Sequence, residues 1–199
     1  MKGVIRLKSG VFGMNIKKLV IVLIIVLFAL TSTACEKPAA VTELSDDEVF
    51  ELYIKAKEAY EWFDLTTIPY YNDKYIEVDG QQYYEVIQPG IDSKKALEDY
   101  LNELFTDDIT ENLMDISSNR YVEHENKLYV LPADRGTDIF KGAESYEVTK
   151  VSDEQIKFTV KVEVYDDPDR KNVSGYEEYD FCLEFLDGKW RFTNFELVR

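Results

Sequence analysis

Histidine and cysteine are scarce in this sequence of 199 residues. It contains one histidine, His124, and two cysteines, Cys35 and Cys182. A zinc site or a Cys–His catalytic pair needs several such side chains, and a single histidine makes either hard to build. We therefore expect His124, in the polar segment 121–125, to be an ordinary surface residue.

Other signatures of catalysis are missing or uninformative. The sequence has no glycine-rich phosphate-binding loop. Adjacent carboxylates occur at 107–108, 166–167 and 177–178, but in so acidic a chain they have little specificity for glycoside hydrolysis or calcium binding. The sequence therefore argues against an enzyme, and we expect no cofactor and no metal.

Positive charge is also in short supply. Residues 1–34 hold five basic residues and no acidic one, so residues 35–199 hold 18 Lys and Arg against 39 Asp and Glu, a net charge of −21. Such a surface repels nucleic acid and anionic lipid headgroups, and it favours a basic partner or a basic cleft. The plainer interpretation is that the acidity keeps the protein soluble.

The N-terminal segment is typical of an export signal. Residues 19–30 are all apolar. Lys17 and Lys18 precede them, and small or polar residues follow at 31–34. A charged start, a short apolar run and a small-residue cleavage region define a bacterial signal peptide. A membrane-spanning helix needs about 20 apolar residues, and this run ends too soon.

Cys35 is the expected lipid attachment point. Residues 30–35, Leu-Thr-Ser-Thr-Ala-Cys, resemble the lipobox of bacterial lipoproteins, in which the cysteine is acylated and becomes the first mature residue. Ala34 fits that pattern, whereas Ser32 stands where leucine is usual. The alternative is simple secretory cleavage, and Met14 is the expected true start because it opens a compact signal peptide by itself.

Cys182 has no partner in the sequence if Cys35 carries lipid, so no internal disulfide is expected and stability comes from packing. Alternation along residues 179–185 places Cys182 on the opposite face of a strand from Phe181, Leu183 and Phe185. It is either a half-buried strand cysteine or a reactive thiol. The lack of basic residues nearby favours the inert cysteine.

Helix signals concentrate after a short spacer at residues 35–44. Ser45 and Glu48 form a capping box, which predicts a helix start. Ser93 begins a second predicted helix, and a third, shorter one follows Thr106. The apolar face expected for the first helix comprises Val49, Phe50, Tyr53, Ile54, Tyr60 and Phe63.

Strand signals surround and follow these helices. Asp79-Gly80 divides residues 74–87 into a predicted hairpin, and Asp187-Gly188 joins the last two strands. Further strand-like runs occupy 120–124, 127–131, 144–151, 155–165, 175–186 and 189–197. The expected fold class is α+β, a single domain over residues 45–199 with N-terminal helices packed on a meandering antiparallel sheet of about eight strands.

One connection stands out between these strands. Residues 132–138 follow the apolar run 128–131 and combine a rigid proline, charges of both signs and a flexible glycine. This composition suits a protruding loop. Taken alone, the segment is more simply explained as a plain loop.

Several stretches together resemble the IseA family. None is diagnostic alone, but their order covers nearly all of residues 45–199. The resemblance implies an extracytoplasmic protein inhibitor of DL-endopeptidases, the NlpC/P60-type cysteine hydrolases that cut peptidoglycan stem peptides. The stretches are Tyr-Glu-Trp-Phe-Asp-Leu at 60–65, residues 128–136, residues 175–181 and residues 188–195.

The resemblance also implies a site. In the family, a negatively charged loop after a strand enters the positively charged active-site cleft of the target. Here that inhibitory loop is Pro132, Ala133, Asp134, Arg135 and Gly136. Asp134 matches the loop acid of the family. Ala133 and Arg135 stand where other members have glycine-rich loops, which reduces flexibility and adds a local positive charge.

These inferences define the expected function and its alternative. We expect a monomeric inhibitor that restrains cell-wall hydrolysis and cell separation, held at the outer face of the membrane by lipid on Cys35, or secreted if that lipid is absent. The alternative is a lipid-anchored module that binds a small ligand or a protein without inhibiting. Trp62 and Trp190 would then line a pocket on the sheet rather than belong to the core.

Overall fold

The computed structural model describes residues 41–198, and the predicted signal peptide, Met14 and Cys35 lie outside them. Within this part, no helix is both long and apolar enough to cross a membrane. The described elements are α2 (Asp46–Asp64), β1 (Tyr70–Val78), β2 (Gln81–Val86), α3 (Lys94–Asn102), α4 (Asp107–Ile116), β3 (Tyr121–His124), β4 (Lys127–Val130), β5 (Lys141–Lys150), β6 (Gln155–Tyr165), β7 (Val173–Leu186) and β8 (Lys189–Phe192).

Helix α2 begins at the predicted capping box. The Ser45 side chain accepts a hydrogen bond from the Glu48 amide at 3.3 Å, and Glu48 Oε2 accepts from the Ser45 amide at 2.8 Å. These two bonds satisfy amides that the first turn of a helix leaves without partners. Ser93 caps α3 in the same way, through a bond from the Ala96 amide at 3.1 Å.

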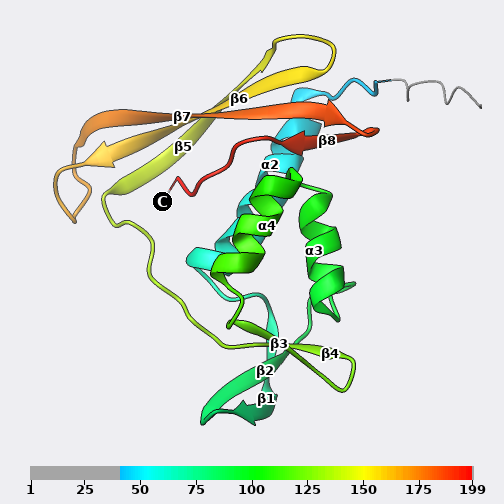
Figure 1. Cartoon of the computed structure of the whole chain (residues 1–199). Coiled ribbons are helices and arrows are strands. Elements are labelled where there is room, and N and C mark those ends of the chain that lie inside the picture. The colour runs from blue at the N-terminus through cyan, green and yellow to red at the C-terminus, as the bar shows by residue number, and fades with distance from the viewer. Residues whose placement is uncertain (1–40, 199) are drawn as a thin grey trace, which may run out of the picture. The chain divides into compact units, whose positions relative to one another are not determined.

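The eight strands form two antiparallel sheets of four, and the helices lie between them (Figure 1). The first sheet has the order β1-β2-β4-β3, and the second sheet has the order β5-β6-β7-β8. The α+β class, the N-terminal helices and the strand number are as predicted. The sequence predicted one continuous meander, whereas the connection at 131–140 separates the strands into two groups.

Helix α2 reaches both sheets. Near its start, the Tyr53 ring lies 4.8 Å from the ring of Phe158 in the second sheet. Near its end, Phe63 lies 5.5 Å from Tyr121 in the first sheet, and the Tyr121 hydroxyl donates to the Trp62 carbonyl at 3.2 Å. A helix of 19 residues is about 28 Å long, so α2 sets the separation of the sheets.

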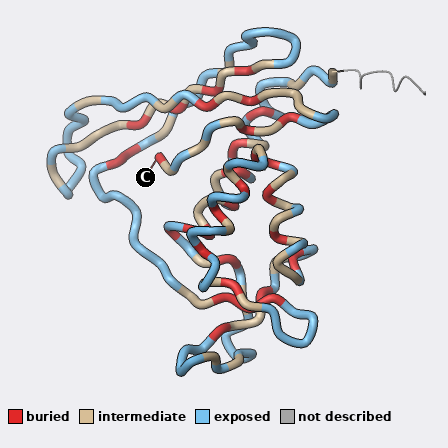
Figure 2. Tube along the Cα trace, viewed as in Figure 1, coloured by how far each residue is buried: buried red, intermediate tan, exposed pale blue. Residues whose placement is uncertain are grey.

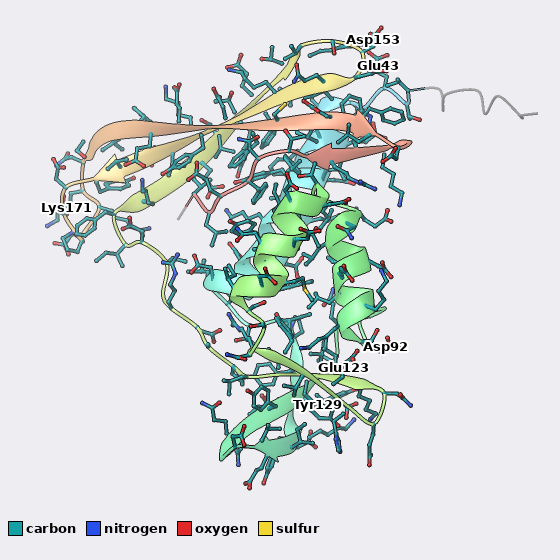
Figure 3. All side chains as sticks on the ribbon, viewed as in Figure 1. Glu43, Asp92, Glu123, Tyr129, Asp153 and Lys171 are labelled. Carbon is teal, nitrogen blue, oxygen red and sulfur yellow. The ribbon has the colours of Figure 1, made fainter. Side chains whose placement is uncertain are left out.

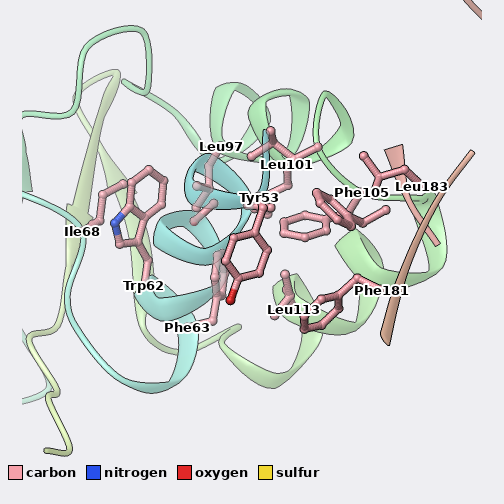
Figure 4. Close-up of a cluster of buried hydrophobic side chains, with 14 of the residues drawn as sticks. Tyr53, Trp62, Phe63, Ile68, Leu97, Leu101, Phe105, Leu113, Phe181 and Leu183 are labelled. Atoms are coloured by element: carbon pink, nitrogen blue, oxygen red, sulfur yellow. The ribbon is translucent and has the colours of Figure 1, made fainter. Parts of the chain in front are cut away.

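The core follows this helix from one sheet to the other (Figure 4). Trp62 stacks on Tyr100 of α3 with ring centres 5.7 Å apart, and Phe105, just after α3, faces Phe192 of β8. The turn between α3 and α4 is also joined to β8 by backbone bonds, from Thr106 N to Phe192 O and from Phe192 N to Leu104 O. One core thus includes residues of both sheets and all three described helices.

Part of the predicted helix face is solvent-exposed. Phe50 and Ile54 keep 37% and 41% of their surface accessible, because the buried face of α2 runs instead through Val49, Tyr53, Ala56, Ala59, Trp62 and Phe63. Phe50 still packs at the margin of the core, with its ring 4.8 Å from that of Tyr146. The two turn signals are confirmed, because Asp79-Gly80 and Asp187-Gly188 both have positive φ. The strand predicted at 189–197 is shorter than expected and ends at Phe192.

Two glycines in and beside β5 provide a test of the packing. A Cβ on Gly142 would lie 2.3 Å from Tyr165 Cε2 and 2.9 Å from Glu163 Cβ, whereas a Cβ on Gly136 would meet no atom within 4 Å. We expect Gly142→Ala to lower the free energy of unfolding by about 1–3 kcal/mol through overpacking. Gly136→Ala, the matched control, should be neutral or stabilise by about 0.4–1 kcal/mol.

Urea unfolding followed by circular dichroism measures both values. Equal stability of the two variants would contradict the close approach of β5 to the Tyr165 ring.

Candidate functional site

The predicted inhibitory loop lies within the connection between the two sheets. The chain leaves β4 at Val130, crosses beside the helices and enters β5 at Lys141 (Figure 1). Every residue from Ala133 to Phe140 is exposed (Figure 2). Because this segment has no regular secondary structure, its conformation depends on side-chain contacts with neighbouring elements.

Arg120 makes the first of these contacts. It lies just before β3, and its backbone carbonyl accepts from the Leu131 amide at 2.8 Å. Its Nη2 donates to the carbonyl oxygens of Ala133 at 2.6 Å and Thr66 at 2.7 Å. The guanidinium therefore joins the start of the loop to the segment that follows α2.

Thr67 makes the second contact, and it orients Asp134. Its hydroxyl donates to Asp134 Oδ1 at 2.7 Å and accepts from the Ala133 amide and from Arg120 Nη2, both at 3.2 Å. One hydroxyl thus uses its single proton and accepts two further bonds. Asp134 Oδ2 has no hydrogen-bond partner among residues 41–198 and remains exposed.

Arg135 makes the third contact, with the end of α2. Its amide donates to the Leu65 carbonyl at 3.1 Å, its Nε donates to Asp64 Oδ1 at 2.8 Å, and its Nη2 bonds Asp64 Oδ2. This bidentate pair lowers the pKa of the Asp64 carboxyl below its usual value, chiefly through the hydrogen bonds from Arg135. The pair is therefore ionised at neutral pH.

The Asp64–Arg135 pair changes the electrostatic character of the loop. Arg135 adds a positive charge, but Asp64 balances it at hydrogen-bond distance. The loop region contains the carboxylates of Asp64, Asp134 and Asp138 and the guanidiniums of Arg120 and Arg135, a balance of one net negative charge. Asp64 is paired with Arg135, whereas Asp134 accepts from Thr67 and Asp138 accepts from the Phe140 amide.

The structure thus gives the predicted loop a defined support. Sequence reasoning expected a protruding loop with a flexible glycine, but Gly136 is absent from the described residues with positive φ. The supporting residues Asp64, Thr67 and Arg120 were not found from the sequence. Their bonds to the loop span 13 to 71 positions, and no periodic pattern links such positions.

His124 and Cys182, the other candidate residues, lie outside the loop. His124 is exposed, with its ring 6.3 Å from that of Tyr129. Cys182 is half-buried and its Sγ lies 3.3 Å from Gln155 Nε2, while Phe181 and Leu183 are buried on the other face, as the alternation predicted. Among the described residues, no cluster of three His, Cys, Asp or Glu side chains is arranged to hold a metal ion.

The two tryptophans belong largely to the core. Trp62 is 2% exposed and Trp190 is 8% exposed. Trp190 borders a hollow of about 270 Å³ whose rim includes Glu43, Lys150 and Asp153. This volume is below the usual range for small-molecule sites, about 300–1,000 Å³, so the hollow gives no support to the alternative of a small-ligand module.

Comparison with known proteins identifies a family. The family model described as IseA DL-endopeptidase inhibitor matches residues 40–196, which include both sheets, the three described helices and the loop. A search of curated proteins found no match.

The Asp64–Arg135 pair can be tested by exchanging its charges. Asp64→Arg and Arg135→Asp each place like charges together. The backbone amide of residue 135 donates to the Leu65 carbonyl, and in each single variant we expect this amide to exchange with solvent about two- to fivefold faster. The double variant Asp64→Arg/Arg135→Asp should restore slow exchange because it restores the pair.

Hydrogen exchange followed by NMR measures these rates, and amides in the β6–β7 ladder are the internal control. If the double variant exchanges as fast as the single ones, the ion pair does not hold the loop.

Proposed function

Because this chain belongs to the IseA family of DL-endopeptidase inhibitors, we propose that it blocks its target by placing the loop of residues 132–136 in the enzyme's active-site cleft. The chain is an inhibitor of DL-endopeptidases rather than an enzyme, as predicted. The proposed targets are NlpC/P60-type hydrolases with a basic cleft. Inhibition of these hydrolases limits cell-wall hydrolysis and cell separation.

The observation that carries this proposal is the state of Asp134. One carboxylate oxygen is held by Thr67 at 2.7 Å, and the other is exposed without a partner in the described part of the chain. A carboxylate fixed in this way loses little conformational freedom when it binds. It is suited to pair with a cation in the cleft, in place of a substrate carboxylate.

The wider charge of the domain supplies the long-range attraction. The net charge over residues 35–199 is −21, whereas the loop of residues 132–136 holds one Asp and one Arg and has no net charge. Such a field speeds encounter with a basic cleft and weakens as salt screens it, over a Debye length of about 8 Å at physiological ionic strength. After the two proteins meet, the loop makes the specific contact in the cleft.

The proposed lipid on Cys35 determines where inhibition occurs. Near the start of the described residues, the Thr42 carbonyl accepts from Trp190 Nε1 at 2.8 Å, and Glu43 pairs with Lys150 at 3.0 Å. Thr42 is seven positions from Cys35 along the chain, a reach of about 25 Å at most. A monomeric inhibitor held this close to the membrane has a raised local concentration there.

We expect Asp134→Lys to raise the inhibition constant for a sensitive NlpC/P60-type endopeptidase at least about tenfold, because it removes the cleft contact and repels a basic site. Peptidoglycan clearing by the purified enzyme gives the inhibition constant. Asp153→Lys is the matched control, because it makes the same charge change in the exposed β5–β6 turn.

Asp134→Asn separates geometry from charge, because an amide oxygen still accepts from Thr67. We expect it to weaken inhibition while the loop amides keep their protection from exchange. Unchanged inhibition by Asp134→Lys would overturn the loop mechanism.

The anchor has its own test. We expect Cys35→Ala to release the protein from the membrane fraction into the medium of producing bacteria, and to abolish labelling by a radioactive fatty acid. Cys182→Ala is the control and should leave both unchanged. A Cys35→Ala protein that stays in the membrane fraction would show that something other than lipid on Cys35 retains it.

A further inference from the structure

A small apolar patch lies at the end of the connection that carries the inhibitory loop. Ile139 and Phe140 are 51% and 39% exposed, and Val173 and Tyr176 at the start of β7 are 39% and 59% exposed. We refer to these four residues as the apolar patch. Exposed apolar side chains are ordinary when scattered singly, but a group of them at one place is characteristic of an interaction site.

Backbone contacts bring Phe140 and Val173 to the two sides of Tyr165, and Ile139 and Tyr176 lie one and three residues from them along the chain. The Phe140 carbonyl accepts from the Tyr165 amide at 2.9 Å, and Tyr165 is paired with Val173 across the β6–β7 ladder. Since neighbouring strands lie about 4.8 Å apart, Phe140 and Val173 are separated by about two strand spacings. This is the end of the second sheet at which Lys171 lies, opposite the end with Asp153 and Glu43 (Figure 3).

Hydrogen bonds hold the backbone of the patch at Ile139 and Phe140. Asp138 Oδ1 accepts from the Phe140 amide at 2.9 Å, and Arg170 Nε donates to the Ile139 carbonyl at 2.8 Å. On β7, the Tyr176 ring lies 4.8 Å from Lys161 Nζ. A binding surface that is already ordered loses less conformational entropy on association.

Other exposed aromatic side chains have partners within the chain. Phe50 packs against Tyr146, and Lys74 Nζ lies over the Tyr71 ring at 3.6 Å. Within the described residues, the Phe140 ring packs on no other aromatic ring, and Ile139 is more than half exposed. The apolar patch therefore has surface that the fold itself leaves uncovered.

The size of a stable interface links the patch to the loop. A specific interface covers about 800 Å² on each partner and involves about 20–30 residues a side, which is a region about 30 Å across. A loop of five residues is too small to supply this area. Ile139 is five residues from Asp134 along an exposed chain, a distance of at most about 18 Å, so both fit within one footprint.

We propose that the apolar patch is the second part of the inhibitory interface and packs against an apolar surface beside the active-site cleft of the target endopeptidase. This inference rests on the proposed function. Asp134 then provides the polar contact inside the cleft, and the patch provides the buried aromatic and aliphatic contacts that dominate binding energy in interfaces. Aromatic and arginine residues, here Phe140, Tyr176 and Arg170, are the types enriched at such places.

The test uses two variants that add the same negative charge at different exposed apolar positions. Ile139→Asp lies in the patch, whereas Val151→Asp, at a residue that is 57% exposed, lies just after β5 at the opposite end of the second sheet. With residues 36–199 and a sensitive endopeptidase, we expect Ile139→Asp to raise the inhibition constant at least tenfold. Val151→Asp should change it by less than twofold.

A second patch variant guards against local unfolding. Tyr176→Ser, on a separate strand, should also weaken inhibition, and thermal unfolding shows whether each variant retains its fold. Because hydrophobic contacts are not screened by salt, the loss caused by Tyr176→Ser should persist at high ionic strength, whereas the effect of Asp134→Lys should shrink.

The outcomes separate this inference from the proposed function. If Ile139→Asp and Tyr176→Ser inhibit like the original chain while Asp134→Lys does not, the patch is not part of the interface but the loop mechanism stands. If Asp134→Lys also inhibits normally, the loop mechanism fails as well. If sedimentation shows that Ile139→Asp dissociates a dimer without changing inhibition, the patch serves self-association and the proposal is overturned.

Discussion

The packing of α2 against both sheets is the constraint on which the rest of this structure depends. Tyr53 lies against Phe158 in the second sheet, and Phe63 lies against Tyr121 in the first. Because one rigid helix spans this distance, the chain that leaves β4 must cross the outside of the domain to reach β5. That crossing creates the exposed connection, and the end of α2 provides the groups that hold it.

The proposed mechanism of inhibition depends on the support of the loop by neighbouring side chains. Arg135 would add an unfavourable positive charge if it were free, but Asp64 balances it and the pair fixes the loop. Thr67 then orients Asp134, while Arg120 joins the two backbones. A loop held in this way is rigid, and in the proposed mechanism rigidity favours affinity for one cleft shape over tolerance of several.

Local signals in the sequence predicted most of the fold. The capping box at Ser45, the Asp79-Gly80 and Asp187-Gly188 turns, and the alternation around Cys182 each depend on residues close in sequence, and the structure confirms them. The division into two sheets and the support of the loop were not predicted. Both depend on contacts between distant residues, such as Thr67 with Asp134, which pattern and propensity do not encode.

The central claim is that inhibition occurs by occupation of the active-site cleft. The most direct measurement is the rate at which iodoacetamide alkylates the catalytic cysteine of a sensitive NlpC/P60-type endopeptidase, with and without saturating inhibitor. Occlusion by the loop predicts a large fall in that rate, which Asp134→Lys at the same concentration does not produce. An unchanged alkylation rate in a fully inhibited enzyme would contradict the account, because the cleft would then be open.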